Sequence, residues 1–164
     1  VREEERHPSF RRHDPDYIVT NFTTTTYNAA GRAESILSAD KMIHYPDDDS
    51  TELERPHVVQ LKPDEPRMTV RADRGLLSSE GDEIFLYDNV RLVREASADR
   101  PEARMTTSFL HIVRNRSLAR TDRPVRFEEP SRRLAGRGME YNYGTGELVL
   151  HAEVRGSFDP RGSQ

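Results

Sequence analysis

The sequence contains no cysteine and no tryptophan among its 164 residues. Without cysteine there can be no disulfide bond, no thiol catalysis and no cysteine-ligated zinc site. This absence fits either the cytosol or a bacterial periplasmic protein that folds without disulfides. No window approaches the roughly eighteen consecutive apolar residues of a membrane-spanning helix, and no signal peptide is visible. We therefore expect none of these residues to cross a bilayer.

The chain is also poor in apolar residues, at 34% hydrophobic against 33% charged. These shares lie on the polar side of the usual values, which favours a thin fold with much exposed surface or a partly disordered chain. The net charge of −4 provides no general basic field for a nucleic acid. A length of 164 residues indicates a single domain.

Motifs for catalysis and for cofactor binding are missing too. There is no G-x-S-x-G motif. His44 and Asp47 could form an acid–base pair, but no nucleophile or oxyanion element accompanies them, so we predict no catalytic residue and no enzyme. The run Gly136-Arg137-Gly138 lacks the third glycine and the helix of a dinucleotide fingerprint, and a β-bulge explains it better. No cofactor is expected.

The acidic run Asp47–Asp49 raises the question of a calcium site. The glycine and the closing glutamate of an EF-hand loop are both missing, so a solvated turn is the better interpretation. None of the six histidines belongs to an H-x-x-x-H pair of metal ligands. No metal site is predicted.

Segments rich in threonine, aromatic and alternating apolar residues are separated by polar turns, which predicts strands. Residues 33–42 also fit a helical spacing, but the alternation of the later segments favours a strand there. We expect a disordered linker over residues 1–15, one antiparallel all-β sandwich, barrel or roll over 16–158, and a frayed tail over 159–164. The expected strands cover residues 17–27, 33–45, 57–61, 69–77, 83–87, 90–94, 105–113, 117–120, 125–127, 133–143 and 147–158.

Apolar residues recur at a spacing of about twenty along the chain. The pairs Val70/Val90, Met105/Val125 and Leu134/Val154 are twenty apart, and Leu37/Val58 is a looser copy. Such a repeat suggests stacked two-strand units with one continuous apolar face. By default this stripe is packed core; if the interior is open, it forms a groove that suits a long acyl chain. The stripe consists of Val70, Ala72, Leu77, Ile84, Leu86, Val90, Met105, Ile112, Val125, Leu134, Met139, Leu148, Leu150 and Val154.

Arginine is abundant and gathers in two clusters. One contains Arg132, Arg133 and Arg137; the other contains Arg114, Arg116, Arg120 and Arg123. Two interpretations remain open: solvated faces paired with nearby glutamates, or contacts to anionic head-group phosphates.

Several motifs together carry a family likeness over roughly residues 14–158. They are Asp16-Tyr17, Tyr27-Asn28, Gly31-Arg32, His44-Tyr45-Pro46-Asp47-Asp48-Asp49-Ser50-Thr51-Glu52-Leu53 with Pro56, Val70-Arg71-Ala72 with Gly75, Leu86 with Val90, Thr106-Thr107, Thr121-Asp122 with Pro124-Val125, Gly138-Met139 and Val154-Arg155-Gly156. In these motifs the chain resembles the periplasmic domain of the LptC family of lipopolysaccharide export proteins.

The resemblance implies an open antiparallel β-jellyroll with an apolar groove, which binds lipopolysaccharide through the stripe and is not an enzyme. It also implies an N-terminal transmembrane helix ahead of residue 1, at the periplasmic face of a Gram-negative inner membrane. Lipopolysaccharide would arrive from the LptBFG transporter and pass to LptA. The alternative is a structural scaffold that joins these partners by strand-edge pairing without holding lipid. The implied transporter edge contains Tyr17, Ile18, Val19 and Phe22, and the implied LptA edge contains Leu148, Val149, Leu150, Val154 and Phe158.

Overall fold

The structure, a computed structural model, describes residues 13–159. Apart from the short 3-10 turn Arg114–Arg116, the regular elements of this part are antiparallel strands, which confirms the all-β prediction. Within it no helix has the length and hydropathy of a membrane span. The strands are β1 Tyr17–Tyr27, β2 Ala33–Tyr45, β3 Ser50–Glu54, β4 His57–Gln60, β5 Met68–Arg71, β6 Arg74–Leu77, β7 Glu83–Arg94, β8 Ala103–Val113, β9 Leu118–Glu129, β10 Arg132–Asn142 and β11 Leu148–Phe158.

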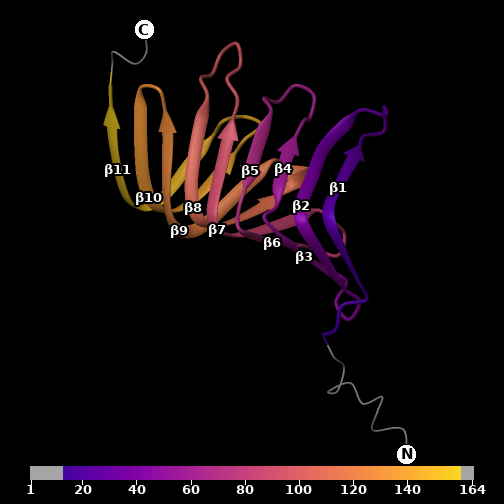
Figure 1. Cartoon of the computed structure of the whole chain (residues 1–164). Coiled ribbons are helices and arrows are strands. Elements are labelled where there is room, and N and C mark those ends of the chain that lie inside the picture. Colours follow the sequence, from indigo (N-terminus) through magenta and orange to yellow (C-terminus); the bar gives the residue numbers. More distant parts are fainter. Residues whose placement is uncertain (1–12, 160–164) are drawn as a thin grey trace, which may run out of the picture.

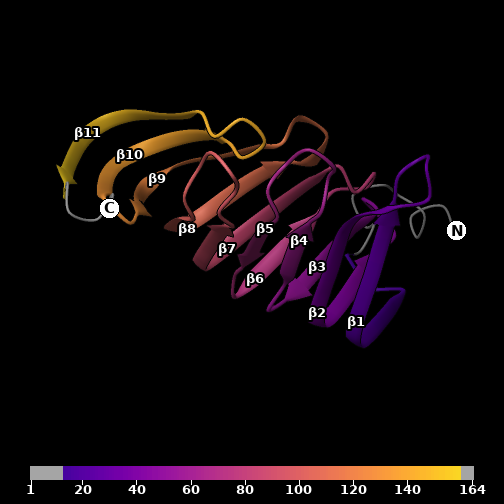
Figure 2. The same cartoon turned by 90° about the horizontal axis from the view of Figure 1, so that it is seen from above.

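All the strands belong to one sheet, in the order β11-β10-β9-β8-β7-β5-β4-β2-β3-β6, with β1 beside β2 and β6 also paired to β7. The strand β7 pairs with β6 through its first half and with β5 through its second half. In the same way β2 pairs with both β3 and β4. Figures 1 and 2 show the strands following one another from β1 at one end of the molecule to β11 at the other.

The long strands change register near their middles. Shifts lie between Tyr87 and Val90 of β7, between Thr107 and His111 of β8, and between Arg137 and Met139 of β10. The strand halves on either side form two layers. The first layer contains β4, β5 and residues 33–38, 90–94, 103–107, 125–129 and 132–136; the second contains β3, β6 and residues 41–45, 83–87, 111–113, 118–121 and 139–142.

Alternate side chains of both layers point into one shared core. Val58 and Val70 of the first layer and Leu53 and Ile84 of the second belong to the same cluster of buried apolar residues. Each is at most 2% exposed. Removal of apolar surface from water at about 25 cal/mol per Å² therefore holds the layers together.

Several expected boundaries differ from the structure. Residues 69–77 form two strands, because the chain leaves the first layer after β5 and enters the second at β6. The strand β3 was not expected at all. The turns expected at 88–89 and 122–124 do not reverse the chain, since β7 and β9 run through them. Asp88 and Asn89 have φ values of 69° and 52°, a conformation that serves a bulge as well as a turn.

The bulge predicted at Gly136–Gly138 is confirmed. The register of β10 shifts between Arg137 and Met139, and Gly138 has a φ of 81°. Glycine adopts this left-handed conformation without a steric penalty, so it permits the strand to bend between the layers.

The twenty-residue spacing is not a structural repeat. Strands β7 to β11 start at residues 83, 103, 118, 132 and 148, so successive starts differ by 20, 15, 14 and 16 residues. Val70 pairs with Leu92 and not with Val90. The spacing reflects the alternation that recurs in every long strand. The expectations for residues 1–12 and 160–164 lie outside the described residues.

Candidate functional site

The predicted stripe lies mainly in the packed centre of the roll. Most of its members are between 0% and 2% exposed: Val70, Ile84, Leu86, Val90, Met105, Ile112, Val125 and Met139. Ala72 is also buried, at 7% exposed. These side chains contact one another within one core cluster, so the centre of the roll is filled.

Toward the β11 end the same interior becomes accessible. Leu148 pairs with buried Tyr141 and Leu150 pairs with buried Met139, so both leucines face the interior, yet both are only half-buried. Leu134 of β10 is half-buried as well. Leu77 is also half-buried, but it lies on β6, away from this end. Val154 is 55% exposed, because β11 is the last strand of the sheet and nothing packs beyond it.

The two end strands carry the exposed large apolar side chains. On β11 these are Val149 and Phe158, at 47% and 65% exposed, besides Val154. On β1 they include Tyr17, Ile18 and Val19, at 49%, 52% and 37% exposed, whereas Phe22 packs partly against the core. Among residues 13–159, each of these strands has one partner, β10 or β2, and its other edge is free for backbone hydrogen bonds.

The two layers are also joined by loops. These loops lie at the ends of the strands, away from the register shifts at which the strands bend. Lys62, in the loop between β4 and β5, donates from Nζ to the backbone oxygen of Arg114 at 2.5 Å. Glu65 of the same loop accepts a hydrogen bond from the Ser117 hydroxyl at 3.0 Å. A third bridge runs from Arg100 to the backbone oxygen of Gly144. These contacts close the mouth of the roll with polar groups over an apolar core.

One buried charge was not predicted from the sequence. Arg94 is 1% exposed and donates to the Tyr141 hydroxyl at 2.6 Å and to the Pro101 backbone oxygen at 2.5 Å. The Glu129 carboxylate lies 3.9 Å from its guanidinium. Alternation placed Arg94 on the buried face of β7, but the charge of an arginine normally predicts exposure.

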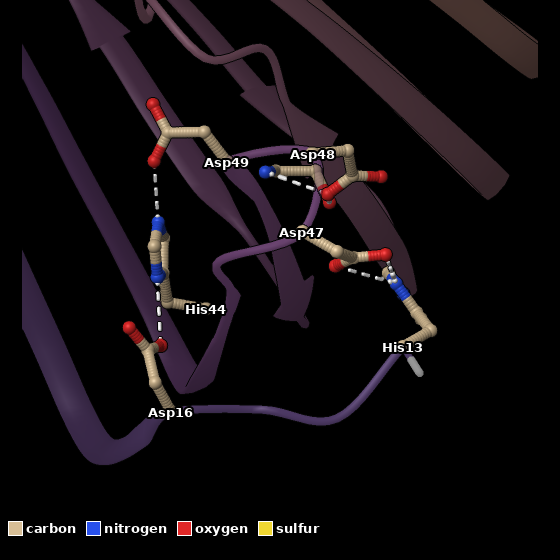
Figure 3. Close-up of polar contacts among 7 residues, drawn as sticks. His13, Asp16, His44, Asp47, Asp48 and Asp49 are labelled. Atoms are coloured by element: carbon tan, nitrogen blue, oxygen red, sulfur yellow. Dashed lines mark hydrogen bonds and ion pairs between the residues drawn. The ribbon is translucent and has the colours of Figure 1, made fainter. Parts of the chain in front are cut away.

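A histidine–aspartate cluster joins the residues before β1 to the turn between β2 and β3 (Figure 3). His44 is bonded through Nδ1 to Asp16 at 2.8 Å and through Nε2 to Asp49 at 2.7 Å. Asp47 contacts His13 instead, at 2.9 Å. The possible His44–Asp47 acid–base pair is therefore wrong, because the turn directs Asp47 toward His13.

These contacts perturb the titration of both histidines. The hydrogen bond to Asp16, followed by that to Asp49, raises the pKa of His44. The hydrogen bond to Asp47 raises the pKa of His13. His13, Asp47 and Asp48 offer ligand atoms within 4.8 Å of one another. However, the Asp48 carboxylate already accepts hydrogen bonds from Ser50, and the Asp47 carboxylate is already bonded to the His13 ring. The cluster serves better as a fastening for the segment before β1.

Most of the arginines in the two predicted clusters have partners in the protein. Arg132 pairs with Glu129 at 2.7 Å, Arg133 approaches Glu128 at 3.6 Å, and Arg137 pairs with Glu153 at 3.2 Å. In the other cluster Arg123 pairs with Asp122, Arg120 donates to His111, and Arg114 is turned inward, where burial lowers its pKa. For Arg123, Arg132, Arg133 and Arg137 the geometry supports the solvated, ion-paired interpretation.

Comparisons with known proteins give this fold a family. A protein-family model described as "Lipopolysaccharide-assembly, LptC-related" matches residues 2–159. The crystal structure of LptH from Pseudomonas aeruginosa, the LptA-homologous periplasmic component of a lipopolysaccharide transport device, matches with a TM-score of 0.64 at 7% identity. The match covers 77% of this chain and 95% of LptH, and at this identity it concerns the jellyroll-like fold alone. No curated protein sequence matches the chain.

Proposed function

The chain belongs to the LptC-related family of lipopolysaccharide-assembly proteins, and from that premise we propose that its β-roll holds lipopolysaccharide in transit across the periplasm. Family and fold make the chain a non-enzymatic component of lipopolysaccharide transport. In this proposal the domain stands at the periplasmic face of the inner membrane, tethered by an N-terminal helix. It receives lipid from LptBFG at the β1 end and passes it to LptA at the β11 end.

One observation carries the proposal: the apolar interior reaches the open edge of the sheet at β11. Leu148 and Leu150 face inward there and are only half-buried, and Val154 is exposed beside them. Acyl chains that cover these side chains would leave water at about 25 cal/mol per Å² of apolar surface. The sugar and phosphate head would remain outside, near polar side chains.

Because the centre of the roll is filled, acyl chains gain access first at the β11 end. Deeper entry requires the two layers to separate, and the polar bridges from Lys62 and Glu65 must then break. Each of those bridges is a hydrogen bond to a charged group, worth about 1.5–3 kcal/mol net. Directed transport therefore needs an external energy source, since a passive groove only exchanges lipid down its gradient.

The adjacent residues Leu150 and Val149 provide a matched test. Leu150 faces the interior opposite Met139, whereas Val149 faces outward opposite Glu140. We predict that Leu150→Arg lowers lipopolysaccharide binding by at least about tenfold, since a charged side chain is poorly tolerated among acyl chains. Val149→Arg should bind like the unmodified domain. Equal binding by both variants, measured by equilibrium binding to purified lipopolysaccharide, would contradict the proposal.

A structural scaffold is the second candidate, and the filled centre of the roll favours it. In this role the free edges of β1 and β11 join transporter and bridge by strand pairing, and the interior holds no lipid. Leu150→Arg would then leave both capture of LptA and delivery of lipopolysaccharide to LptA intact. In the conduit role the same variant captures LptA but fails to deliver lipid.

A further inference from the structure

A row of exposed arginines crosses the outer face of the first layer. Arg71 of β5 pairs in register with Arg91 of β7, which pairs with Thr106 of β8, and Thr106 pairs with Arg126 of β9. Through Ala135 of β10 the row continues to Arg155 of β11. The neighbouring residues Val70, Val90 and Val125 are buried in the core, so Arg71, Arg91 and Arg126 point away from it. All four arginines, Arg155 included, are exposed.

These four arginines have no carboxylate partner. Within residues 13–159, the side chains of Arg71, Arg91, Arg126 and Arg155 form no ion pair and donate no hydrogen bond. Arg71 lies directly opposite Arg91, an arrangement that destabilises a sheet. Arg71 also pairs in register with His57 of β4. The pKa of His57 is lowered, mainly by burial and in addition by the positive charge of Arg71.

The next outward-facing row of the same layer is different. There Arg104 pairs with Glu102 at 2.9 Å, and Arg133 approaches Glu128 at 3.6 Å. Glu128 stands between Arg104 and Arg133 in register, so positive and negative charges alternate. The absence of acidic residues is thus a property of one row and not of the whole face.

A groove of about 830 Å³ runs along this row. Arg91, Arg126 and Arg155 line it together with the hydroxyl residues Thr106 and Ser108. Its lining also includes the Arg137–Glu153 pair, whose carboxylate is occupied at 3.2 Å. From β5 to β11 the row crosses five strand spacings, a length of about 24 Å at ~4.8 Å per spacing.

We propose that this arginine row docks the domain on the phosphate-rich surface of an anionic phospholipid bilayer. Guanidinium groups bind phosphate oxygens in a bidentate fashion, and a row of them about 24 Å long matches an array of head groups better than a single small anion. The chain as a whole carries −4, so the attraction must come from the local row.

The row and the apolar interior lie on opposite faces of the same layer. A lipid with its acyl chains in the interior can bring its head group to the row only by passing around an edge of the sheet. The docking surface is therefore assigned to the membrane and not to the transported lipid, and it stands whether or not the interior holds lipid.

Co-sedimentation with vesicles tests the assignment. The probes are phosphatidylcholine vesicles with and without phosphatidylglycerol, at low salt. We expect binding only to the anionic vesicles, and Arg71→Gln/Arg91→Gln/Arg126→Gln/Arg155→Gln should lower it by at least about a hundredfold, since one arginine near an anionic surface contributes roughly fivefold. The matched control is Arg67→Gln/Arg104→Gln/Arg132→Gln/Arg133→Gln, which removes four charges that each have a glutamate partner.

The outcomes separate cleanly. Loss of vesicle binding by the row variant with retention by the control supports the membrane surface, and circular dichroism verifies that both variants are folded. Equal losses of vesicle binding in the two variants would overturn the proposed membrane docking. So would a failure of the unmodified domain to bind anionic vesicles. A row variant that binds vesicles normally but loses dispersed lipopolysaccharide would also overturn it, because the row would then contact the cargo.

Discussion

Arg94 and Tyr141 form a buried polar pair within the roll. The Tyr141 hydroxyl is fully buried and accepts a hydrogen bond from Arg94 at 2.6 Å. Tyr141→Phe leaves the arginine without this acceptor in a place that water does not reach. We predict a loss of about 1–3 kcal/mol in the free energy of unfolding, the usual cost of an unsatisfied buried donor.

The matched control for this prediction is Tyr27→Phe. Tyr27 is 63% exposed, so removal of its hydroxyl should change stability by less than about 0.5 kcal/mol. Urea denaturation of both variants measures the difference. Equal stabilities of the two variants would show that the Arg94 contact contributes nothing.

His44 gives the fold a pH-dependent contribution. Its hydrogen bonds to Asp16 and Asp49 raise its pKa in the folded state. A raised pKa means that the stabilisation is fully present below the unfolded value of about 6.5 and is lost as the pH rises through the folded pKa. We therefore predict that the stability difference between the unmodified protein and His44→Gln is largest in mild acid and shrinks toward alkaline pH.

Denaturation of both proteins between about pH 5.5 and 8.5 tests this, because aspartates remain ionised over that range. In parallel, NMR titration of Asp49→Asn should show a lower His44 pKa than in the unmodified domain. A stability difference that grows with pH would have the wrong sign.

At the scale of single residues the sequence predicts few of these side-chain contacts. Hydrophobic alternation identifies the buried positions, but it assigns no partner to a buried Arg94. Proximity along the chain suggested His44 with Asp47, whereas the turn and the residues before β1 select Asp16 and Asp49. Such pairings depend on contacts between distant segments, which composition and spacing do not encode.

Among the elements, the bulge of β10 is sensitive to substitution. Gly138 has a φ of 81°, and an added Cβ would lie 3.1–3.2 Å from the His151 side chain. Gly31 has the same φ but nothing within 4 Å. Both alanine variants pay for the left-handed backbone, on the order of 1 kcal/mol. Only Gly138→Ala also crowds the His151 side chain of β11.

We predict that Gly138→Ala loses more stability than Gly31→Ala, by about 1 kcal/mol, since crowding of this kind is added to the backbone strain. Thermal unfolding of the two variants gives the comparison. If Gly31→Ala loses as much, the contact between β10 and β11 at the bulge is easily relaxed.

The strands show how far local patterns reach. Alternation and turn residues locate β2, β8, β10 and β11 closely, and they identify the glycine bulge. These patterns give the wrong strand boundary where the same residues can form either a turn or a bulge. The pair Asp88–Asn89 has turn chemistry, but it bends β7 without ending it. The strand β3 escaped notice because five residues between two turns show too little periodicity.

For the molecule as a whole, the family motifs predicted an open jellyroll. The structure adds the position of the opening. The centre is packed, polar bridges close the mouth, and the β11 end exposes the interior face. Sequence spacing could not locate that opening, because a filled and an accessible stripe have the same alternation. The functional claim therefore rests on inward-facing residues at one edge.

Site-specific photocrosslinking with purified lipopolysaccharide tests that claim most directly. A photoreactive residue at Leu150 reports on the interior face of β11, and one at Val149 reports on the outer face of the same strand. The conduit proposal predicts crosslinks at Leu150 and few or none at Val149. Equal crosslinking at both positions, or none at Leu150, would contradict it and leave the scaffold as the function of this domain.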